Sequence, residues 1–296
     1  MTVGIVGSGP AGSLAAVLLA QRGVTVSLFD EQAETGGHLI YDDYPLADDV
    51  LASSWKLEID QALKSSNVDH RCSTVVWAAY QRDGVHELAL NHQGTQDTFT
   101  CEHAIIATGT TDRPLIRPGV TLPGVLTSRA IRILTRRHGV APGQRCAIIG
   151  ENAEAARLAD DLTALGLEVQ GVIPEAEVAS IEGTTTVESV VTCDGTVIAV
   201  DCVVVAAGEA ADFQLASILG LKSTFSPESR SWTVESASGP GNLFVIGGAR
   251  SGALGFRTVL ESAVTCAAKL TGASITPGDI SSVLPVTSLV LERARS

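Results

Sequence analysis

The sequence predicts an α/β protein with two Rossmann-like three-layer domains, the first of which is discontinuous and surrounds a shortened central domain. The prediction rests on one pattern that occurs three times. A strand, a glycine-containing turn and a helix open the chain at TVGIVGSGPAGSLAAVLLA, and the same order returns at CAIIGENAEAAR and at LFVIGGARSGALGF. An unbroken apolar strand followed by a helix is typical of a parallel sheet that is covered on both faces.

Length and composition fit this fold. The 296 residues are enough for two domains, and 45% hydrophobic with 18% charged residues is typical of a globular protein. The net charge of −13 argues against nucleic acid and anionic membranes as partners, because both attract basic patches. No charged segment precedes the first strand, and LAAVLLA is too short to span a bilayer. A cytoplasmic location is therefore expected.

The first turn, Gly7-Ser8-Gly9-Pro10-Ala11-Gly12, has the G-x-G-x-x-G spacing of a dinucleotide site. The first glycine permits the tight turn, the second lets the backbone approach a pyrophosphate, and the third packs the helix on the strand. Asp30 ends the second strand, where a carboxylate can bind a ribose hydroxyl and disfavours a 2′-phosphate. We expect a dinucleotide here, the alternative being a purely structural glycine turn.

The elements that follow alternate between helix-like and strand-like patterns. A helix over Ser54–Lys64 is predicted because Trp55, Ile59 and Leu63 recur every four residues. Hairpins are expected in 75–100, since Asp83-Gly84 and Gln93-Gly94 break alternating runs. HAIIATG is a further buried strand.

Proline and glycine in RPLIRPGVTLPG then indicate a crossing between domains. A helix is expected over 128–137, strands over 187–205, and a second crossing at SASGPGN. The predicted domains are 1–112, 113–236 and 237–296, of which the first and last form one unit.

The second turn has lost the features that bind a pyrophosphate. Asn152 stands where the middle glycine belongs, and Glu151 adds a negative charge beside it. Glu175, the acid nearest to the expected ribose position, comes one residue late, after Pro174. The central domain is therefore expected to keep its shape and to lack a nicotinamide site. The alternative is a working site that Asn152 merely modifies, because helix N-termini bind phosphate even with imperfect turns.

The six cysteines Cys72, Cys101, Cys146, Cys193, Cys202 and Cys266 occur singly. Without a CxxC pair or a close grouping they predict no zinc site and no iron–sulfur cluster, so no metal is expected. They are expected to be buried thiols that act as small hydrophobic side chains.

GSGPAG, FDEQAETGGHL and AIIATG together resemble the flavoproteins with two dinucleotide-binding domains, of which thioredoxin reductase is the small member. The resemblance implies that the first nucleotide is FAD. It implies cofactor contacts from residues of the three quoted segments: Gly7, Gly9, Pro10, Ala11, Gly12, Asp30, Glu31, Gly36, Gly37, His38, Thr108 and Gly109.

A more particular resemblance lies in ATGTTDRPLIRPGVTLPGVLTSRAI, which is similar to the FAD subunits of hydrogen cyanide synthase, opine oxidases and heteromeric amino-acid dehydrogenases, including the sarcosine oxidase α subunit. This resemblance implies an FAD-dependent oxidoreductase that oxidises a small amine or amino acid without NAD(P)H. It also implies partner subunits, a homo-oligomer or both.

Two features weaken this picture, and one further alternative stays open. The flavoproteins carry an aspartate after the final strand where this chain has Gly248, so backbone from Gly248 and Ala249 would have to contact the flavin, and a non-catalytic scaffold subunit becomes an alternative. His38 is the one candidate acid–base group, although a lone histidine is more often structural. A thiol or disulfide oxidoreductase remains open, but the missing CxxC disfavours it.

The segment from Pro277 onward is rich in apolar residues for a terminal tail. It is expected either to dock on another polypeptide or to pack back onto its own domain.

Overall fold

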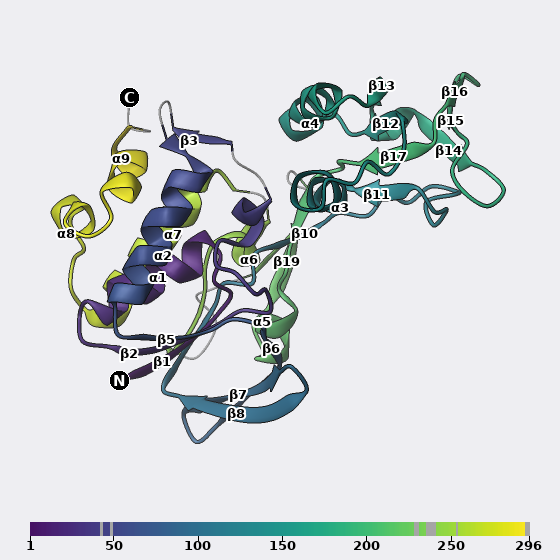
Figure 1. The fold of residues 1–296 in the computed structure, drawn as a ribbon. Coiled ribbons are helices and arrows are strands. Elements are labelled where there is room, and N and C mark those ends of the chain that lie inside the picture. The colour runs from purple at the N-terminus through teal and green to yellow at the C-terminus, as the bar shows by residue number, and fades with distance from the viewer. Residues whose placement is uncertain (42–43, 48–49, 228–230, 235–240, 253, 294–296) are drawn as a thin grey trace. The chain divides into compact units, whose positions relative to one another are not determined.

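A computed structural model describes residues 1–41, 44–47, 50–227, 231–234, 241–252 and 254–293 of the chain (Figure 1). The chain forms two compact units. Met1–Thr110 and Ala210–Ser296 make the first unit, and Thr111–Glu209 makes the second, which we call the central unit.

The first unit is built on a five-stranded parallel sheet with the order β21-β9-β1-β2-β5. Val3 of β1 pairs with Val26 on one side and with His103 on the other, so the glycine-turn strand lies at the centre. Its residues are buried on both faces, as a covered parallel sheet requires. The strands are β1 (Thr2–Val6), β2 (Thr25–Phe29), β5 (Val68–Arg71), β9 (His103–Ile106) and β21 (Leu243–Val245).

Helices α1, α2 and α7 cover one face of this sheet (Figure 1). The predicted helix around 54–64 is α2, and its Trp55 and Ile59 are fully buried. The helices and short elements of this layer are α1 (Pro10–Ala20), η1 (Gly37–Ile40), β3 (Pro45–Ala47), β4 (Val50–Leu51), α2 (Ala52–Ser65), α7 (Phe256–Thr271), α8 (Pro277–Ser281) and α9 (Pro285–Arg293). The short helix α6 (Gly248–Ser251) contributes Ala249 to the apolar cluster on the other face.

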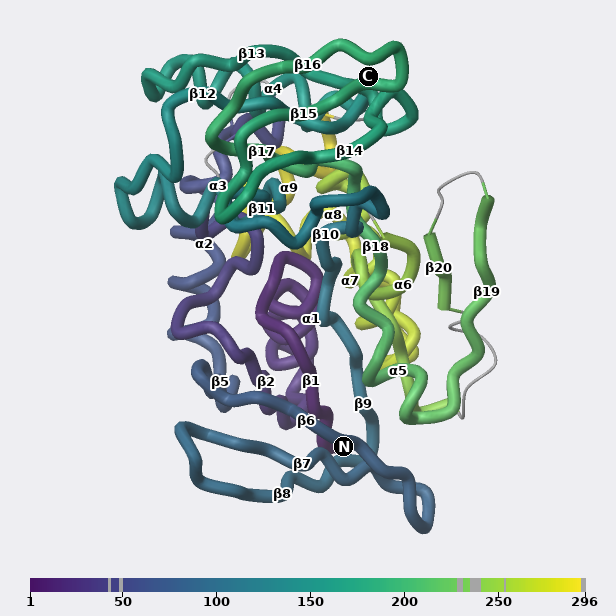
Figure 2. Tube along the Cα trace, turned by 90° about the vertical axis from the view of Figure 1, so that its right-hand side faces the viewer, coloured from purple at the N-terminus to yellow at the C-terminus, as the bar shows by residue number. Residues whose placement is uncertain are grey.

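An antiparallel meander covers the other face of the sheet (Figure 2). Leu88 and Leu90 of the meander belong to the same apolar cluster as Ile106 of the sheet. Its turns are the two predicted ones, and Asp83 and Gln93 adopt positive φ angles of 51° and 50° there. The elements on this side are β6 (Thr74–Arg82), β7 (Val85–His92), β8 (Thr95–Cys101), α5 (Gln214–Ile218), β19 (Ser223–Ser226) and β20 (Ser231–Val234). The first unit therefore has three layers.

The central unit has three layers as well. Its parallel sheet has the order β11-β17-β12-β13, with α3 and α4 on one face and the antiparallel β14-β15-β16 sheet on the other. The predicted α/β class with two Rossmann-like units is confirmed. The elements are β11 (Val125–Thr127), α3 (Ser128–Arg132), η2 (Ile133–Arg137), β12 (Arg145–Ile149), α4 (Ala153–Ala164), β13 (Glu168–Ile173), η3 (Glu175–Glu177), β14 (Val178–Glu182), β15 (Ser189–Thr192), β16 (Val197–Ala199) and β17 (Cys202–Val205).

The chain returns to the first unit earlier than the sequence predicts. The predicted boundary at 236/237 lies outside the described residues, whereas the observed return is at Ala210. The reason is packing: Leu215 and Leu219 of the α5 segment are buried in the same apolar cluster as Leu88 of the meander. The outgoing strand β10 (Thr110–Asp112) and the returning strand β18 (Glu209–Ala211) pair with each other, as Figure 2 shows.

The apolar tail packs back onto its own unit. Ile280, Leu284 and Val290 are buried in the apolar cluster that also contains residues of α1 and α2. Glu58 of α2 caps the beginning of α9, because its carboxylate accepts hydrogen bonds from the backbone N–H groups of Val286 at 2.6 Å and Thr287 at 2.9 Å. Of the two alternatives for the tail, internal packing is the one observed. Among the described helices none is long and apolar enough to cross a membrane.

Three partly or fully buried histidines predict a decline in stability in mild acid. Burial lowers the pKa of His70, His86 and His103 below the ordinary 6.5, although nearby acids or Asn242 oppose the shift. The unfolded chain therefore binds protons before the folded chain does, so the free energy of unfolding falls as the pH drops below about 6.5. Denaturant titrations at pH 7.5 and 5.5 should show this loss, and His86→Gln should reduce it. A pH-independent midpoint would contradict the prediction.

Candidate dinucleotide site

Different constraints require glycine at the three positions of the first turn. Gly7 has φ +104°, and a Cβ there would lie 2.3 Å from the Ala107 carbonyl oxygen. A Cβ on Gly12 would lie 1.9 Å from the Gly7 carbonyl oxygen, so helix packing on the strand excludes a side chain. Gly9 is different, because its nearest neighbour would be the Gly37 Cα at 3.9 Å. The fold has room for a side chain at Gly9, which leaves the approach of a ligand as the reason for glycine.

The second glycine pair lies directly against this turn. The Gly36 N–H donates to the Ser8 carbonyl at 3.0 Å, and a Cβ on Gly37 would come within 3.1 Å of the Gly9 Cα. Both glycines have positive φ angles, 122° and 57°, which side chains disfavour. His38 follows in η1 and is half-buried. The structure thus brings together two motifs that are separated by more than twenty residues in the sequence.

Asp30 lies beside the turn, but its carboxylate is largely engaged within the protein. Oδ2 accepts the N–H of Ser8 at 2.5 Å and the Ser8 hydroxyl at 2.8 Å, while Oδ1 accepts the Gln32 N–H at 2.8 Å. Glu31, next in the chain, is exposed. The sequence analysis did not identify Ser8 as a site residue. A serine between the first two glycines, together with an acid at the end of the second strand, could have predicted this hydrogen bond.

Thr108 and Gly109 reach the same place from β9. A Cβ on Gly7 would lie 3.2 Å from the Thr108 N, so the two turns are neighbours. The Thr108 hydroxyl donates to the Asp212 carbonyl at 2.6 Å. The Thr108 hydroxyl is therefore used in a hydrogen bond to the returning chain, so a cofactor would contact the backbone atoms of this turn.

The last glycine segment also converges on the beginning of α1. A Cβ on Gly247 would lie 2.9 Å from the Ala11 Cβ, and one on Gly248 would lie 2.7 Å from the Thr110 Cγ2. Ala249 is fully buried. The carboxylate expected from the flavoprotein pattern is absent at Gly248, and the methyl group of Thr110 leaves little space for it.

The first turn fits an anionic ligand. The N-cap of α1 is Gly9, no described side chain caps that helix, and its first turn holds no acid. Backbone N–H groups at the start of an eleven-residue helix, with an open approach at Gly9, suit a pyrophosphate.

The corresponding turn of the central unit is closed by its own side chains. Asn152 caps α4, since its Oδ1 accepts the Ala155 N–H at 2.9 Å while its Nδ2 donates to the Ala206 carbonyl at 3.1 Å. Glu154 lies in the first helical turn, 2.7 Å from Arg132 and 3.0 Å from the Ser128 hydroxyl. The Glu154 carboxylate would repel a phosphate at this position, and it is already paired with Arg132, the cation that could attract one.

Glu175 also has a partner within the central unit. The Arg113 guanidinium lies 3.1 Å from its carboxylate, and Arg113 also donates to the Ala207 carbonyl. The acid that the sequence offers for a ribose is therefore held in an internal ion pair.

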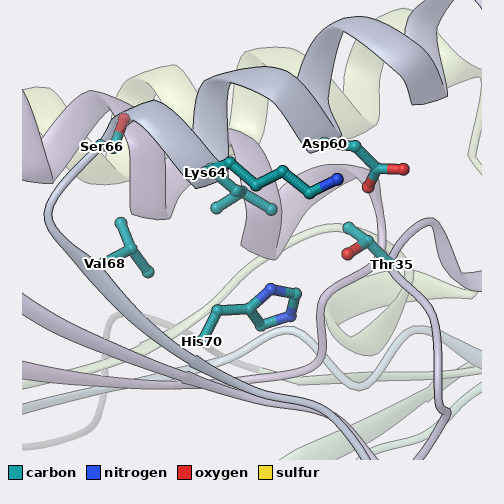
Figure 3. A pocket seen from close by; sticks show the side chains of 7 residues that line it. Thr35, Asp60, Lys64, Ser66, Val68 and His70 are labelled. Carbon is teal, nitrogen blue, oxygen red and sulfur yellow. The ribbon is translucent and has the colours of Figure 1, made fainter.

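The cysteines are all free thiols, and four of them are buried. Cys72 is half-buried, with its Sγ 3.3 Å from the His70 Nε2, and burial raises the pKa of its thiol. His70 faces a hollow of about 290 Å³ that is also lined by Thr35, Asp60 and Lys64 (Figure 3). The described residues contain no group of three or more His, Cys, Asp or Glu side chains placed to hold a metal.

Several curated proteins are similar to this chain in sequence. An opine oxidase subunit of Agrobacterium tumefaciens (strain Ach5) is 31% identical over 58% of this chain and 36% of its own length. The hydrogen cyanide synthase protein HcnB of Pseudomonas protegens is 33% identical over 57% of this chain and 37% of its own length. The α subunit of Rhizobium meliloti sarcosine oxidase is 28% identical over 60% of this chain and 19% of its own length. The chain thus matches well under half of each of these relatives.

Solved structures share the fold. L-proline dehydrogenase of P. horikoshii has a TM-score of 0.79 at 20% identity, covering 96% of this chain and 59% of that protein. Thioredoxin reductase of T. acidophilum has a TM-score of 0.70 at 20% identity, covering 91% of this chain and 97% of that protein. A family model described as pyridine nucleotide-disulphide oxidoreductase matches residues 1–174. The match includes the glycine turn, the adjoining glycine pair and β9, and the chain therefore belongs to the pyridine nucleotide-disulphide oxidoreductase family, with FAD as its cofactor.

Proposed function

We propose that this chain is the FAD-carrying subunit of an enzyme that oxidises an amine or amino-acid-type substrate without using NAD(P)H. The observation that carries the proposal is the contrast between two helix beginnings. The N-terminus of α1 is open and uncapped among the described residues, whereas Asn152 and Glu154 close that of α4. This contrast supports a nucleotide site at α1 and argues against one at α4.

The proposed FAD site consists of backbone and side chains that converge on the start of α1. The turn residues Gly7, Gly9, Pro10, Ala11 and Gly12 would hold the pyrophosphate, and Asp30 the ribose. The remaining proposed contacts are Glu31, Gly36, Gly37, His38, Thr108, Gly109, Gly248 and Ala249. FAD supplies a two-electron acceptor when bound, and the protein supplies position and electrostatics.

His38 is the proposed acid–base group, because it directly follows the glycine pair that lies against Gly9. A histidine can exchange a proton near neutral pH. His38→Gln should lower the rate of substrate oxidation while leaving flavin content unchanged; an unaltered rate across pH 6–9 would remove His38 from the mechanism.

The relatives support the substrate class and the need for a partner. The matched proteins from opine oxidase, sarcosine oxidase and hydrogen cyanide synthase are each named as one subunit of an enzyme. We propose that this chain likewise works with other polypeptides, as a hetero-oligomer that can contain more than one copy of it. Co-expression with neighbouring reading frames, followed by assay against sarcosine, glycine, proline and opines, tests both proposals. Flavin reduction by none of these compounds, in the assembled complex, would reject the substrate class.

The nicotinamide prediction has a direct test. Mixed anaerobically with NADH or NADPH, the purified yellow protein should keep its flavin absorption for minutes, because the Asn152 cap and the Glu154 carboxylate at the start of α4 disfavour a pyrophosphate there. Dithionite serves as the control, since it must bleach the same sample. Rapid bleaching by either nucleotide would show that the central unit still binds it.

A non-catalytic or electron-transfer scaffold subunit that binds FAD weakly is the second candidate, and Gly248 is the observation that favours it. One charged hydrogen bond, worth roughly 1.5–3 kcal/mol, is absent where the flavoprotein pattern has an aspartate. Such a subunit would lose FAD readily during purification, and an amine substrate would not reduce the flavin that it keeps. Anaerobic reduction of the flavin band by substrate in the complex therefore separates the two candidates.

A further inference from the structure

Ser8 links four parts of the proposed cofactor site. It is fully buried, and both of its donors go to one oxygen of Asp30. Its carbonyl accepts the Ser13 hydroxyl of α1 at 2.8 Å and the Gly36 N–H at 3.0 Å. The phosphate turn, the end of β2, helix α1 and the second glycine pair therefore all meet at this residue.

These contacts decide which oxygen of Asp30 remains for a ligand. A carboxylate oxygen has two acceptor positions. Oδ2 uses both on Ser8, whereas Oδ1 uses one on the Gln32 N–H. Within the described part of the chain one acceptor position on Oδ1 is left, and its direction is fixed because Ser8 holds the other oxygen of the carboxylate.

We propose that Ser8 is a positioning residue for FAD, which orients the Asp30 carboxylate toward the ribose and holds it in register with the phosphate turn. The inference rests on the proposed cofactor site in the first unit. Charge-assisted hydrogen bonds are the stronger ones, so the pair is suited to this task. Rotation of the carboxylate after loss of the hydroxyl would weaken ribose recognition while leaving the three glycines of the turn in place.

The test compares Ser8→Ala with Ser13→Ala. Both variants remove a fully buried hydroxyl whose hydrogen bond lies in the same turn, but the Ser13 hydroxyl donates to the Ser8 carbonyl and not to Asp30. FAD dissociation constants are measured on the full chain by flavin fluorescence, and unfolding midpoints are measured without FAD. We expect Ser8→Ala to weaken FAD roughly tenfold or more, and Ser13→Ala less than about threefold, with similar losses in the FAD-free midpoint.

A second readout isolates the ribose. ADP and 2′,3′-dideoxy-ADP are titrated against FAD-free protein, and the wild type should prefer ADP. Ser8→Ala should move the ratio of the two affinities toward one, whereas Ser13→Ala should leave it unchanged. Should Ser8→Ala not fold, Ser8→Cys, which keeps the size and weakens the donor, is put through the same comparison.

The outcomes distinguish failure of the proposed cofactor site from failure of the positioning role of Ser8. A wild-type chain that binds no FAD would reject the proposed cofactor site. A wild-type chain that binds FAD, with equal effects of the Ser8 and Ser13 variants on FAD affinity and on the ADP ratio, would reject only the positioning role of Ser8.

Discussion

Gly9→Val is expected to yield a folded protein without flavin. The Cβ of residue 9 has open space, with the Gly37 Cα as its nearest neighbour at 3.9 Å, so the fold tolerates a side chain. The same side chain would stand between the backbone and a pyrophosphate. Loss of two charge-assisted hydrogen bonds corresponds to roughly 3–6 kcal/mol, or about a hundredfold to ten-thousandfold in FAD affinity. The flavin-to-protein absorbance ratio and the FAD-free unfolding midpoint are the measurements.

Two variants serve as controls for this result. Gly12→Val should fail to fold, because its Cβ would lie 1.9 Å from the Gly7 carbonyl oxygen. Asn152→Ala should keep full flavin content and lose about 1 kcal/mol of stability with the cap of α4. If Asn152→Ala lost its FAD, or if Gly9→Val retained it, the assignment of FAD to the first unit would be wrong.

Deleting residues 277–296 should unfold the first unit. The deletion removes Ile280, Leu284 and Val290, each at most 4% exposed, from the apolar cluster that they share with α1 and α2. Burial of three such side chains contributes roughly 4.5–9 kcal/mol, which is comparable with the whole stability of a domain. Glu58 would also lose the helix that it caps. We expect insoluble protein, or a sharply lowered unfolding midpoint, which thermal denaturation detects.

Matched point variants distinguish this role from docking. Leu289 is 39% exposed in α9, so Leu289→Ser should leave the midpoint nearly unchanged, whereas Leu284→Ser, at a fully buried position, should lower it. Loss of a partner polypeptide in the Leu289 variant alone would mean that the outer side of α9 is also an interface. A truncated chain with wild-type stability would contradict the core role.

The parts of the fold that depend on local pattern could be predicted from the sequence. The turn at Gly7, the helix around Trp55 and the positive-φ hairpins at Asp83 and Gln93 all follow from spacing and residue type, since these fix backbone geometry over a few residues. The closed nature of the second turn was also predictable, because Asn152 is a strong helix cap and a poor neighbour for a phosphate.

What the sequence could not provide are contacts between distant segments. The return at Ala210 depends on α5 packing against the meander, and nothing in the α5 sequence indicates that surface. The engagement of Asp30 by Ser8 depends on the distance between the end of β2 and the first turn. The packing of the tail onto its own unit includes hydrogen bonds to Glu58, which lies more than two hundred residues earlier in the chain. Long-range packing and hydrogen-bond partners are properties of the folded molecule, and local propensity does not encode them.

The pairing of β10 with β18 makes the central unit a removable insertion. The chain leaves and re-enters the first unit through adjacent strands, and hydrogen bonds flank the crossing, from the Asp212 N–H to the Gly109 carbonyl at 3.0 Å and from the Arg113 N–H to the Gly208 carbonyl at 2.8 Å. A short hairpin turn could therefore replace residues 113–208 and join the two strands directly. The product would be a single-domain protein that contains the first unit alone, with a hairpin in place of the inserted central unit. It would offer a compact scaffold into which an electron-donating domain could be inserted at the same junction.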